Sequence, residues 1–224
     1  MTQANDSAPR TWQQTKSQNT RESILNAAID CIYEKGYGRT TTERVARKAG
    51  VSRGAMLHHF PTRQALISAT VHHLNDLRLQ AFAAEESRIQ EGQHYSLIEE
   101  GIETYWEQLK SPLFTVFQEL QILSRTDTEL AEVMRPAIEE YDRAWIKAVQ
   151  NLFPDLAESR AHGLASLTTQ FLLEGLALNR ETRSNPRRER LVVDGLKAQL
   201  RTLYSDVTES VDRASARRRA GQDG

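Results

Sequence analysis

The sequence predicts an all-α fold in two parts, a small N-terminal helix-turn-helix domain of three helices and a larger C-terminal helical domain. Its 224 residues are 39% hydrophobic and 26% charged, a composition that suits one or two folded domains. Long runs rich in Ala, Leu, Glu, Gln and Arg contain few β-branched alternations, which favours helices over strands. Glycine and proline divide these runs where helices are expected to end or begin.

The first helix is expected over residues 20–35, where apolar side chains recur at helical spacing until Gly36 ends the pattern. Residues 1–18 are polar and are expected to form a flexible N-terminal arm. Basic side chains in and beside this arm suit either a solvated leader or a segment that follows a DNA groove. They are Arg10, Lys16 and Arg21.

Residues 41–60 have the pattern of a helix-turn-helix. Thr41 can cap a short helix, because its hydroxyl can accept a hydrogen bond from a free amide of the first turn. Gly50 then ends that helix, since glycine enters the left-handed C-cap conformation without steric cost. Ser52 can cap a second short helix over residues 53–59, and Pro61 prevents its continuation. Two short helices joined this tightly must cross steeply.

The second short helix is expected to present one face outward, because Met56 and Phe60 would pack inward. The residues of the opposite face are Arg53, Ala55, Leu57 and His58. Such a face could enter a major groove of DNA. The alternative is an ordinary helical hairpin with solvated charges.

With its flanking sequence, this stretch resembles the N-terminal domain of TetR-family transcriptional regulators, whose pattern is T-x-x-x-[IV]-A-x-x-A-G-V-S-x-G-x-[LM]-x-x-H-F. The matching residues are Thr41, Val45, Ala46, Ala49, Gly50, Val51, Ser52, Gly54, Met56, His59 and Phe60. Residues 24–37 match the family's first helix, so the resemblance covers about residues 20–70. Two positions depart from the pattern. Leu57 stands where tyrosine is usual and cannot hydrogen-bond a phosphate, and Ile32 replaces the usual aromatic residue of the first helix.

The resemblance implies that the protein binds double-stranded DNA in a sequence-specific way. The residues expected to face the groove are Arg53, Gly54, Ala55, Leu57 and His58. Of these, only Arg53 can make a bidentate contact to guanine. The residues expected to hold phosphates without reading sequence are Thr41, Thr42, Arg44, His59 and Arg63. Each basic member has an alternative role as a solvated surface charge, and His59 has one in capping or packing.

The charge distribution agrees with this interpretation. Residues 1–63 contain ten Lys or Arg and five Asp or Glu, a net charge of +5, whereas the rest of the chain carries −6 of the total of −1. Positive charge concentrated around the helix-turn-helix would attract DNA phosphates independently of sequence.

The chain beyond the helix-turn-helix is expected to be helical throughout. The expected helices cover residues 62–90, 96–109, 112–124, 127–151, 155–183 and 187–207, with Pro136 kinking or dividing the fourth. The predicted domains are a helix-turn-helix domain over 19–65, an effector-binding and dimerisation domain over 66–208, and a flexible tail over 209–224. The resemblance implies that the helix over 62–90 transmits ligand-dependent motion to the DNA-binding domain.

The middle helices combine aromatic residues with a few polar ones, a composition that suits a pocket for an organic effector. The candidates are Trp106, Phe117, Met134, Tyr141, Trp145, Gln170, Phe171 and Glu174. Packing in the core is the alternative for each of them. Glu174 is the more telling candidate, since a carboxylate among leucines needs a partner, either a ligand or a protein arginine.

The last two expected helices are apolar enough to form a dimer interface. The first is apolar around much of its circumference between Leu164 and Leu178. The apolar positions of the second are Val192, Val193, Leu196, Leu200, Leu203 and Tyr204. Two copies of this pair could form a four-helix contact in a homodimer, and such a dimer would read a near-palindromic operator. Burial within one subunit is the alternative.

Several other classes of protein are not expected. The sequence has no run of eighteen apolar residues and no signal peptide, which predicts a cytoplasmic protein without a membrane partner. Cys31 is the only cysteine and is expected to be a buried packing thiol. Neither His58-His59 nor His72-His73 suits one metal ion, because neighbours on a helix point about 100° apart. No catalytic motif is present, so we expect neither an enzyme nor a cofactor.

Residues and resemblance together predict a homodimeric DNA-binding transcriptional regulator, a repressor that a small organic effector releases from its operator. A DNA-binding regulator without an effector is the alternative. The helical segments over residues 96–207 amount to a domain of their own and favour the first prediction.

Overall fold

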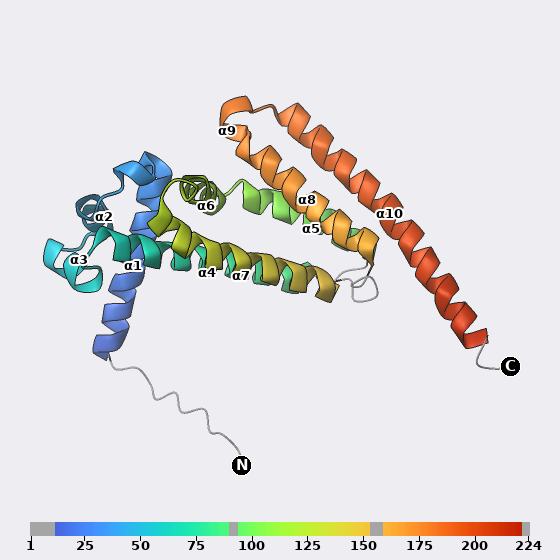
Figure 1. Cartoon of the computed structure of the whole chain (residues 1–224), viewed down its shortest axis with the longest axis horizontal. Coiled ribbons are helices and arrows are strands. Elements are labelled where there is room, and N and C mark those ends of the chain that lie inside the picture. The colour runs from blue at the N-terminus through green and yellow to red at the C-terminus, as the bar shows by residue number, and fades with distance from the viewer. Residues whose placement is uncertain (1–11, 90–93, 153–158, 221–224) are drawn as a thin grey trace, which may run out of the picture. The chain divides into compact units, whose positions relative to one another are not determined.

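The computed structural model describes residues 12–89, 94–152 and 159–220, and within these ranges the chain forms helices and no strand (Figure 1). This confirms the predicted all-α fold. By their contacts, the described residues up to 74 and those of 119–135 form one compact unit, and the described residues of 75–118 and from 136 onward form a second.

Three helices contribute residues to both units. They are α4 (Arg63–Ile89), α6 (Pro112–Leu123) and α7 (Thr128–Leu152). Their starts agree with the prediction, because Thr62 accepts from the amide of Ala65 and Asp127 accepts from the amide of Leu130. Pro136 lies inside α7 without ending it. The first unit therefore extends beyond the segment 19–65 that the sequence marks as a domain.

The first unit contains α1 (Trp12–Lys35), the 3₁₀ turn η1 (Tyr37–Arg39), α2 (Thr42–Ala49) and α3 (Arg53–His59). Its core is built from residues at helical spacing on α1 and from the inward residues of α2, α3 and α4. The core residues are Ile24, Leu25, Ala27, Ala28, Cys31, Val45, Ala46, Met56, Phe60 and Leu66. Cys31 is thus a buried packing residue, as predicted, and burial raises the pKa of its thiol.

Helix α1 begins earlier than the sequence pattern indicates. Residues 12–18 are helical and exposed, although we expected them to belong to a flexible arm. They are rich in Gln and include Lys16, residue types of good helix propensity, but they bury nothing and so leave no apolar periodicity to detect. Residues 1–11 of the expected arm lie outside the described ranges.

The second unit contains α5 (His94–Leu109), α8 (Arg160–Leu178), α9 (Arg180–Arg183) and α10 (Pro186–Ala220). Helices α5, α8 and α10 pack against one another. Their shared core includes Ile102, Tyr105, Trp106, Leu109, Phe114, Trp145, Ala165, Leu173, Ala177, Val193, Leu196 and Leu200.

The last helices differ from the expected ranges. Ser159 caps α8 by accepting from the amide of His162, and the expected start at residue 155 lies outside the described ranges. The chain then breaks at Asn179 before the short α9. Helix α10 runs to Ala220, past the predicted end at residue 207, because its alanines and arginines favour a helix without any apolar pattern.

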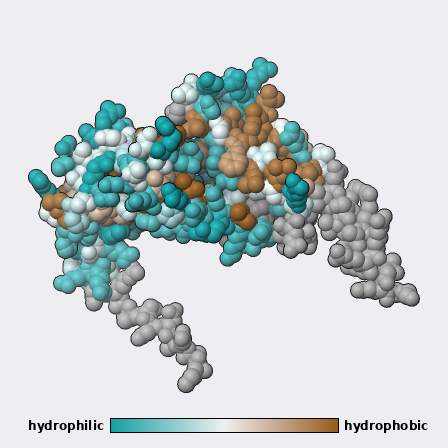
Figure 2. Space-filling model, viewed as in Figure 1, coloured by the Kyte–Doolittle hydropathy of each residue, from teal (hydrophilic) through white to brown (hydrophobic). Residues whose placement is uncertain are grey.

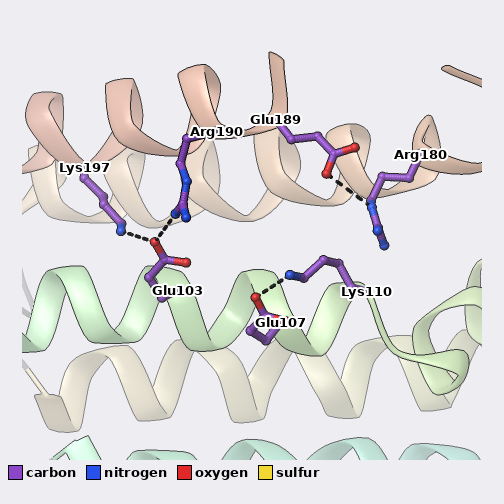
Figure 3. Close-up of polar contacts among 7 residues, drawn as sticks. All are labelled: Glu103, Glu107, Lys110, Arg180, Glu189, Arg190 and Lys197. Atoms are coloured by element: carbon purple, nitrogen blue, oxygen red, sulfur yellow. Dashed lines mark hydrogen bonds and ion pairs between the residues drawn. The ribbon is translucent and has the colours of Figure 1, made fainter. Parts of the chain in front are cut away.

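Ion pairs join α10 to its neighbours (Figure 3). The Glu103 carboxylate of α5 accepts hydrogen bonds from Arg190, at 3.1 Å, and from Lys197, which is buried. Arg180 of α9 pairs with Glu189 at 3.4 Å. The contact with Lys197 lowers the pKa of Glu103, which favours the ionised form of this carboxyl.

The apolar residues of the last two long helices fall into two groups. We expected Leu196 and Leu200 in a dimer interface, but both are buried within the subunit, in the core shared by α5, α8 and α10. The exposed group is instead Leu164, Leu167, Phe171, Leu172 and Leu178 on α8, with Leu191 on α10. Figure 2 shows hydrophobic residues gathered over these two helices. We call this group the α8 apolar face.

Candidate nucleic-acid interface

The turn between α2 and α3 is fixed by backbone geometry and by caps. Thr41 accepts from the amide of Arg44 at 3.3 Å, and Ser52 accepts from the amide of Ala55 at 3.1 Å. Gly50 has φ 68° and ψ 25°, the left-handed conformation predicted from the sequence. The amide of Val51 then bonds to the carbonyl of Ala46 at 3.0 Å, which closes the turn.

Helix α3 buries one side and exposes the other. Met56 and Phe60 are 1% and 2% exposed, as the sequence predicts, so they set the orientation of the helix. The exposed residues are Arg53, Gly54, Leu57 and His58, while Ala55 and His59 are half-buried. Of the residues assigned to groove contacts, the structure therefore leaves Arg53, Gly54, Leu57 and His58 accessible and partly covers Ala55.

Arg53 is the cation on this face best placed to act outside the protein. It is exposed at the first position of α3, and it forms no hydrogen bond or ion pair with any other described residue. Its charge contributes to lowering the pKa of Glu43, after the hydrogen bonds that Glu43 accepts from its own backbone and from Thr41. The Arg53 guanidinium thus keeps its donors available for a bidentate contact.

Two other cations assigned to phosphate contacts already hold the segment before α2. Arg44, half-buried, donates to the carbonyl of Arg39. Arg63 donates to the carbonyls of Thr40 and Tyr37 at 3.1 and 2.9 Å and lies 4.4 Å from the centre of the Tyr37 ring. Both side chains therefore brace the turn η1, a role that the sequence did not indicate.

The same turn is also held by residues of α6 and by the cap of α7 within the first unit. The amide of Tyr37 donates to Glu119 Oε1 at 2.6 Å, and its hydroxyl donates to Asp127 Oδ2 at 3.1 Å. Gly36 has φ 81°, and a Cβ there would lie 3.2 Å from Glu119 Oε1. We call these residues, with Arg63, the Tyr37 anchor. It links the domain of α2 and α3 to segments more than eighty residues further along the chain.

The other residues assigned to phosphate contacts differ in their exposure and hydrogen bonding. Thr41 is exposed but uses its hydroxyl oxygen as a cap, and Thr42 is half-buried. Partial burial lowers the pKa of His59, and the nearby charges of His58 and Arg21 lower it further. In the protein without DNA the lowered pKa favours the neutral form of His59, which can contact a phosphate as a hydrogen-bond donor.

The residues assigned to an effector pocket do not form one group. Trp106, Phe117, Tyr141, Trp145 and Gln170 are buried in the second unit, and Glu174 is half-buried there. Phe171 is 66% exposed and belongs to the α8 apolar face, because the turn of the helix carries it away from Gln170. Met134 is buried in the first unit.

Polar contacts connect several of the buried residues of the second unit. The hydroxyl of Tyr105 donates to Glu174 Oε1 at 3.0 Å, and Gln170 donates to the same oxygen at 3.4 Å. The Tyr105 and Trp145 rings lie 4.4 Å apart, and Trp145 Nε1 donates to Ser166 at 3.1 Å. Burial raises the pKa of Glu174, against the effect of these hydrogen bonds.

Sequence reasoning missed a buried cation in this cluster. Arg78 of α4 is 7% exposed, and its guanidinium carbon lies 3.5 Å from the centre of the Phe117 ring and 3.9 Å from that of Tyr141. Its position four residues after Leu74, on the inward stripe of α4, was the signal available in the sequence. We call Arg78 with Phe117, Tyr141, Tyr105, Glu174 and Gln170 the Arg78 cluster.

Two further observations concern the kinds of site and segment present. Within the described ranges, no group of His, Cys, Asp and Glu side chains is arranged to hold a metal ion. None of the described helices combines the length and hydropathy needed to cross a bilayer.

The fold and the exposed face of α3 define a helix-turn-helix protein. Residues 24–70 match the sequence model of the family described as bacterial regulatory proteins, tetR family. An uncharacterized HTH-type transcriptional regulator of Mycobacterium tuberculosis strain H37Rv is 27% identical over 129 residues, which cover 58% of this chain and 65% of that protein. Residues 24–70 of this chain are therefore similar to the N-terminal domain of TetR-family transcriptional regulators.

Solved structures show the same fold. A Mesorhizobium loti protein assigned to the TetR family aligns with a TM-score of 0.65 at 18% identity, over 85% of this chain and 97% of that one. The multidrug binding protein EbrR, solved in complex with imidazole, aligns with a TM-score of 0.53 at 22% identity, over 80% of this chain and 93% of that one. The chain thus matches nearly the full length of these structures, but less than two thirds of the M. tuberculosis relative.

Proposed function

We propose that this protein is a homodimeric repressor that binds a near-palindromic DNA operator through α3 and leaves it when a small organic molecule binds the second unit. The single observation that carries the DNA-binding part is the outward face of α3, on which Arg53 keeps its guanidinium free of other described residues. The family match over residues 24–70 supports the same conclusion.

A second copy of the chain would complete the assembly. The α8 apolar face presents leucines and a phenylalanine at helical spacing, opposite the side of α8 that packs inside the subunit. An exposed apolar group of this kind is typical of a protein interface. A symmetric dimer also suits DNA reading, since one short recognition helix contacts too few bases to select a site alone.

An effector would act through a helix that serves both units. Phe117 packs on Arg78 in the second unit, and Glu119, two residues later on α6, accepts from the Tyr37 amide in the first unit. A ligand that shifts Phe117 would move Glu119 with it and disturb the Tyr37 anchor. EbrR, by its name, offers a precedent of this fold for binding small organic molecules.

The test is operator affinity measured against ligand concentration. Ligands found by thermal stabilisation of the full protein should lower operator affinity by about 5- to 150-fold, and operator should weaken the ligand by the same factor. Glu119→Gln should leave ligand affinity unchanged while reducing that coupling, because the amide is a weaker partner for the Tyr37 backbone. Ligands that bind tightly without changing operator affinity would contradict the effector-release proposal.

A further inference from the structure

Arg78 is a buried cation with an unused hydrogen-bond donor. Its Nη1 atom is buried and has no hydrogen-bond partner among the described residues. Burying a guanidinium costs free energy unless its N–H groups donate hydrogen bonds. Proteins therefore seldom bury an arginine with a terminal nitrogen that lacks an acceptor. This orphaned donor needs an explanation.

The groups around Arg78 include the carboxylates of Glu174 and Asp142, but no described residue accepts from its Nη1 atom. Burial lowers the pKa of its guanidinium, and the opposing influences come first from the Tyr141 and Tyr105 hydroxyls and only then from Glu174. The Glu174 carboxylate is already hydrogen-bonded to Tyr105 and Gln170 through the same oxygen. The Arg78 cluster therefore holds a positive charge close to two aromatic rings, with one guanidinium nitrogen left without an acceptor.

The geometry of the cluster matches what an organic carboxylate needs. The guanidinium presents parallel N–H donors in one plane, which fits the two oxygens of a carboxylate. The guanidinium carbon of Arg78 lies 3.5 Å from the centre of the Phe117 ring and 3.9 Å from that of Tyr141, so a carboxylate bound by Arg78 would have aromatic side chains beside it. We propose that the effector is an organic acid, bound as its carboxylate anion by Arg78 within this cluster.

This inference rests on the proposed effector-responsive function and adds the chemical class of the effector. It also gives a new role to Glu174, whose partner in the sequence interpretation was either a ligand or a protein arginine. An anion beside Arg78 would be repelled by an ionised Glu174, whereas a cation would be attracted to it. Removing the charge of Glu174 should therefore strengthen the binding of an anionic effector and weaken that of a cationic one.

The experiment compares carboxylic acids with their neutral amides on the full-length protein without DNA. The probes are benzoate with benzamide and decanoate with decanamide, which pair an aromatic and an aliphatic body with the same two head groups. Binding is measured by calorimetric titration up to millimolar concentration. At least one acid should bind, and its amide should bind roughly 10- to 100-fold more weakly, the size expected for loss of a charge-assisted hydrogen bond.

The variants are chosen so that folding and binding can be separated. Arg78→Met should weaken the acid by roughly the same 10- to 100-fold factor, while its melting temperature in the absence of ligand stays equal to or rises above that of the wild type, because an unpaired buried charge is removed. Arg78→Lys keeps the charge without the planar donor pair and should also weaken the acid. It serves as the deciding variant if Arg78→Met does not fold. Glu174→Gln should bind the acid at least as tightly as the wild type.

The inference is overturned if no acid binds, if acid and amide bind equally, or if both Arg78 variants bind the acid like the wild type. It is also overturned if Glu174→Gln weakens the acid while a cationic amine binds instead. Its failure differs from failure of the proposed function. Acids that bind through Arg78 but leave operator affinity unchanged support the carboxylate site and contradict effector release. A neutral ligand that releases operator equally well from the wild type and the Arg78 variants supports effector release and contradicts the carboxylate site.

Discussion

Arg53 and Arg63 are both exposed arginines near the recognition helix, but the structure gives them different roles. The Arg53 guanidinium is uncommitted, whereas Arg63 donates to two backbone carbonyls and stacks on Tyr37. A guanidinium can read a base only if its paired donors are available. The sequence cannot separate the two, because both are simply basic residues beside a helix start.

The first residue-scale prediction concerns base readout. Arg53→Ala should weaken binding to the preferred operator by about 1 to 3 kcal/mol and relax specificity at one base pair in each half-site. Arg53→Lys should retain binding to random DNA but lose the same specificity, since lysine keeps the charge without the bidentate fork. Selection of sites from random duplexes checks both variants. An unchanged base preference in Arg53→Ala would show that α3 is not oriented as we propose.

The second residue-scale prediction concerns Arg63. If it braces η1, then Arg63→Ala and Arg63→Lys should both speed hydrogen exchange at the Tyr37 and Arg39 amides and lower stability by about 1 to 2 kcal/mol. Lysine cannot reproduce both carbonyl contacts together with the stacking on Tyr37. If it acts only as a phosphate-binding charge, Arg63→Lys should behave like the wild type in both exchange and DNA affinity. Exchange measured by mass spectrometry on the free protein separates these outcomes.

At the scale of elements, the turn between α2 and α3 depends on one glycine. Gly50 has a φ of 68°, and a Cβ at this position would meet no atom within 4 Å, so any cost of substitution comes from the backbone alone. Gly50→Ala should therefore destabilise the first unit by about 1 to 2 kcal/mol. Gly38→Ala is the matched control, because Gly38 is not among the positive-φ residues and also has open space around it. Chemical denaturation should show a loss for Gly50→Ala and none for Gly38→Ala.

The elements that the sequence predicted correctly are those with strong local signals. The caps at Thr41, Ser52 and Asp127 and the left-handed Gly50 are properties of short segments, and all four are as predicted. The extensions of α1 to Trp12 and α10 to Ala220 were missed, because polar helix without a buried face has no periodicity.

In the candidate sites, the sequence predicted which residues share one face of a helix but not which residues of distant segments come into contact. The outward face of α3 follows from helical spacing around Met56, so its members could be named from the sequence. Arg78 could not be matched with Phe117 and Tyr141, because their meeting depends on how separate helices pack. The contact between Tyr37 and Glu119 in the Tyr37 anchor could not be predicted for the same reason.

At the scale of the whole molecule, two apolar positions test the proposed dimer. Phe171 is 66% exposed on the α8 apolar face, whereas Leu196 is 4% exposed in the subunit core. Phe171→Glu should give folded monomers with little operator affinity, because it places charge in the contact between subunits. Leu196→Glu should instead destabilise the subunit itself by about 4 kcal/mol or more.

Light scattering and thermal melting of the two variants, measured together, separate assembly from folding. Phe171→Glu should melt as a normal folded protein while scattering as a monomer. A Phe171→Glu protein that stays dimeric would contradict the interface that we assign to the α8 apolar face, whatever its DNA affinity.

The central claim is that two copies of this chain read DNA together through α3, and selection of binding sites from random duplexes by the wild-type protein tests it most directly. A symmetric pair of recognition helices on one face of the duplex should enrich a near-palindrome whose half-site centres lie about 34 to 36 Å apart, one helical turn, or a multiple of that distance. Enrichment of a single asymmetric half-site, or of no sequence at all, would contradict the account.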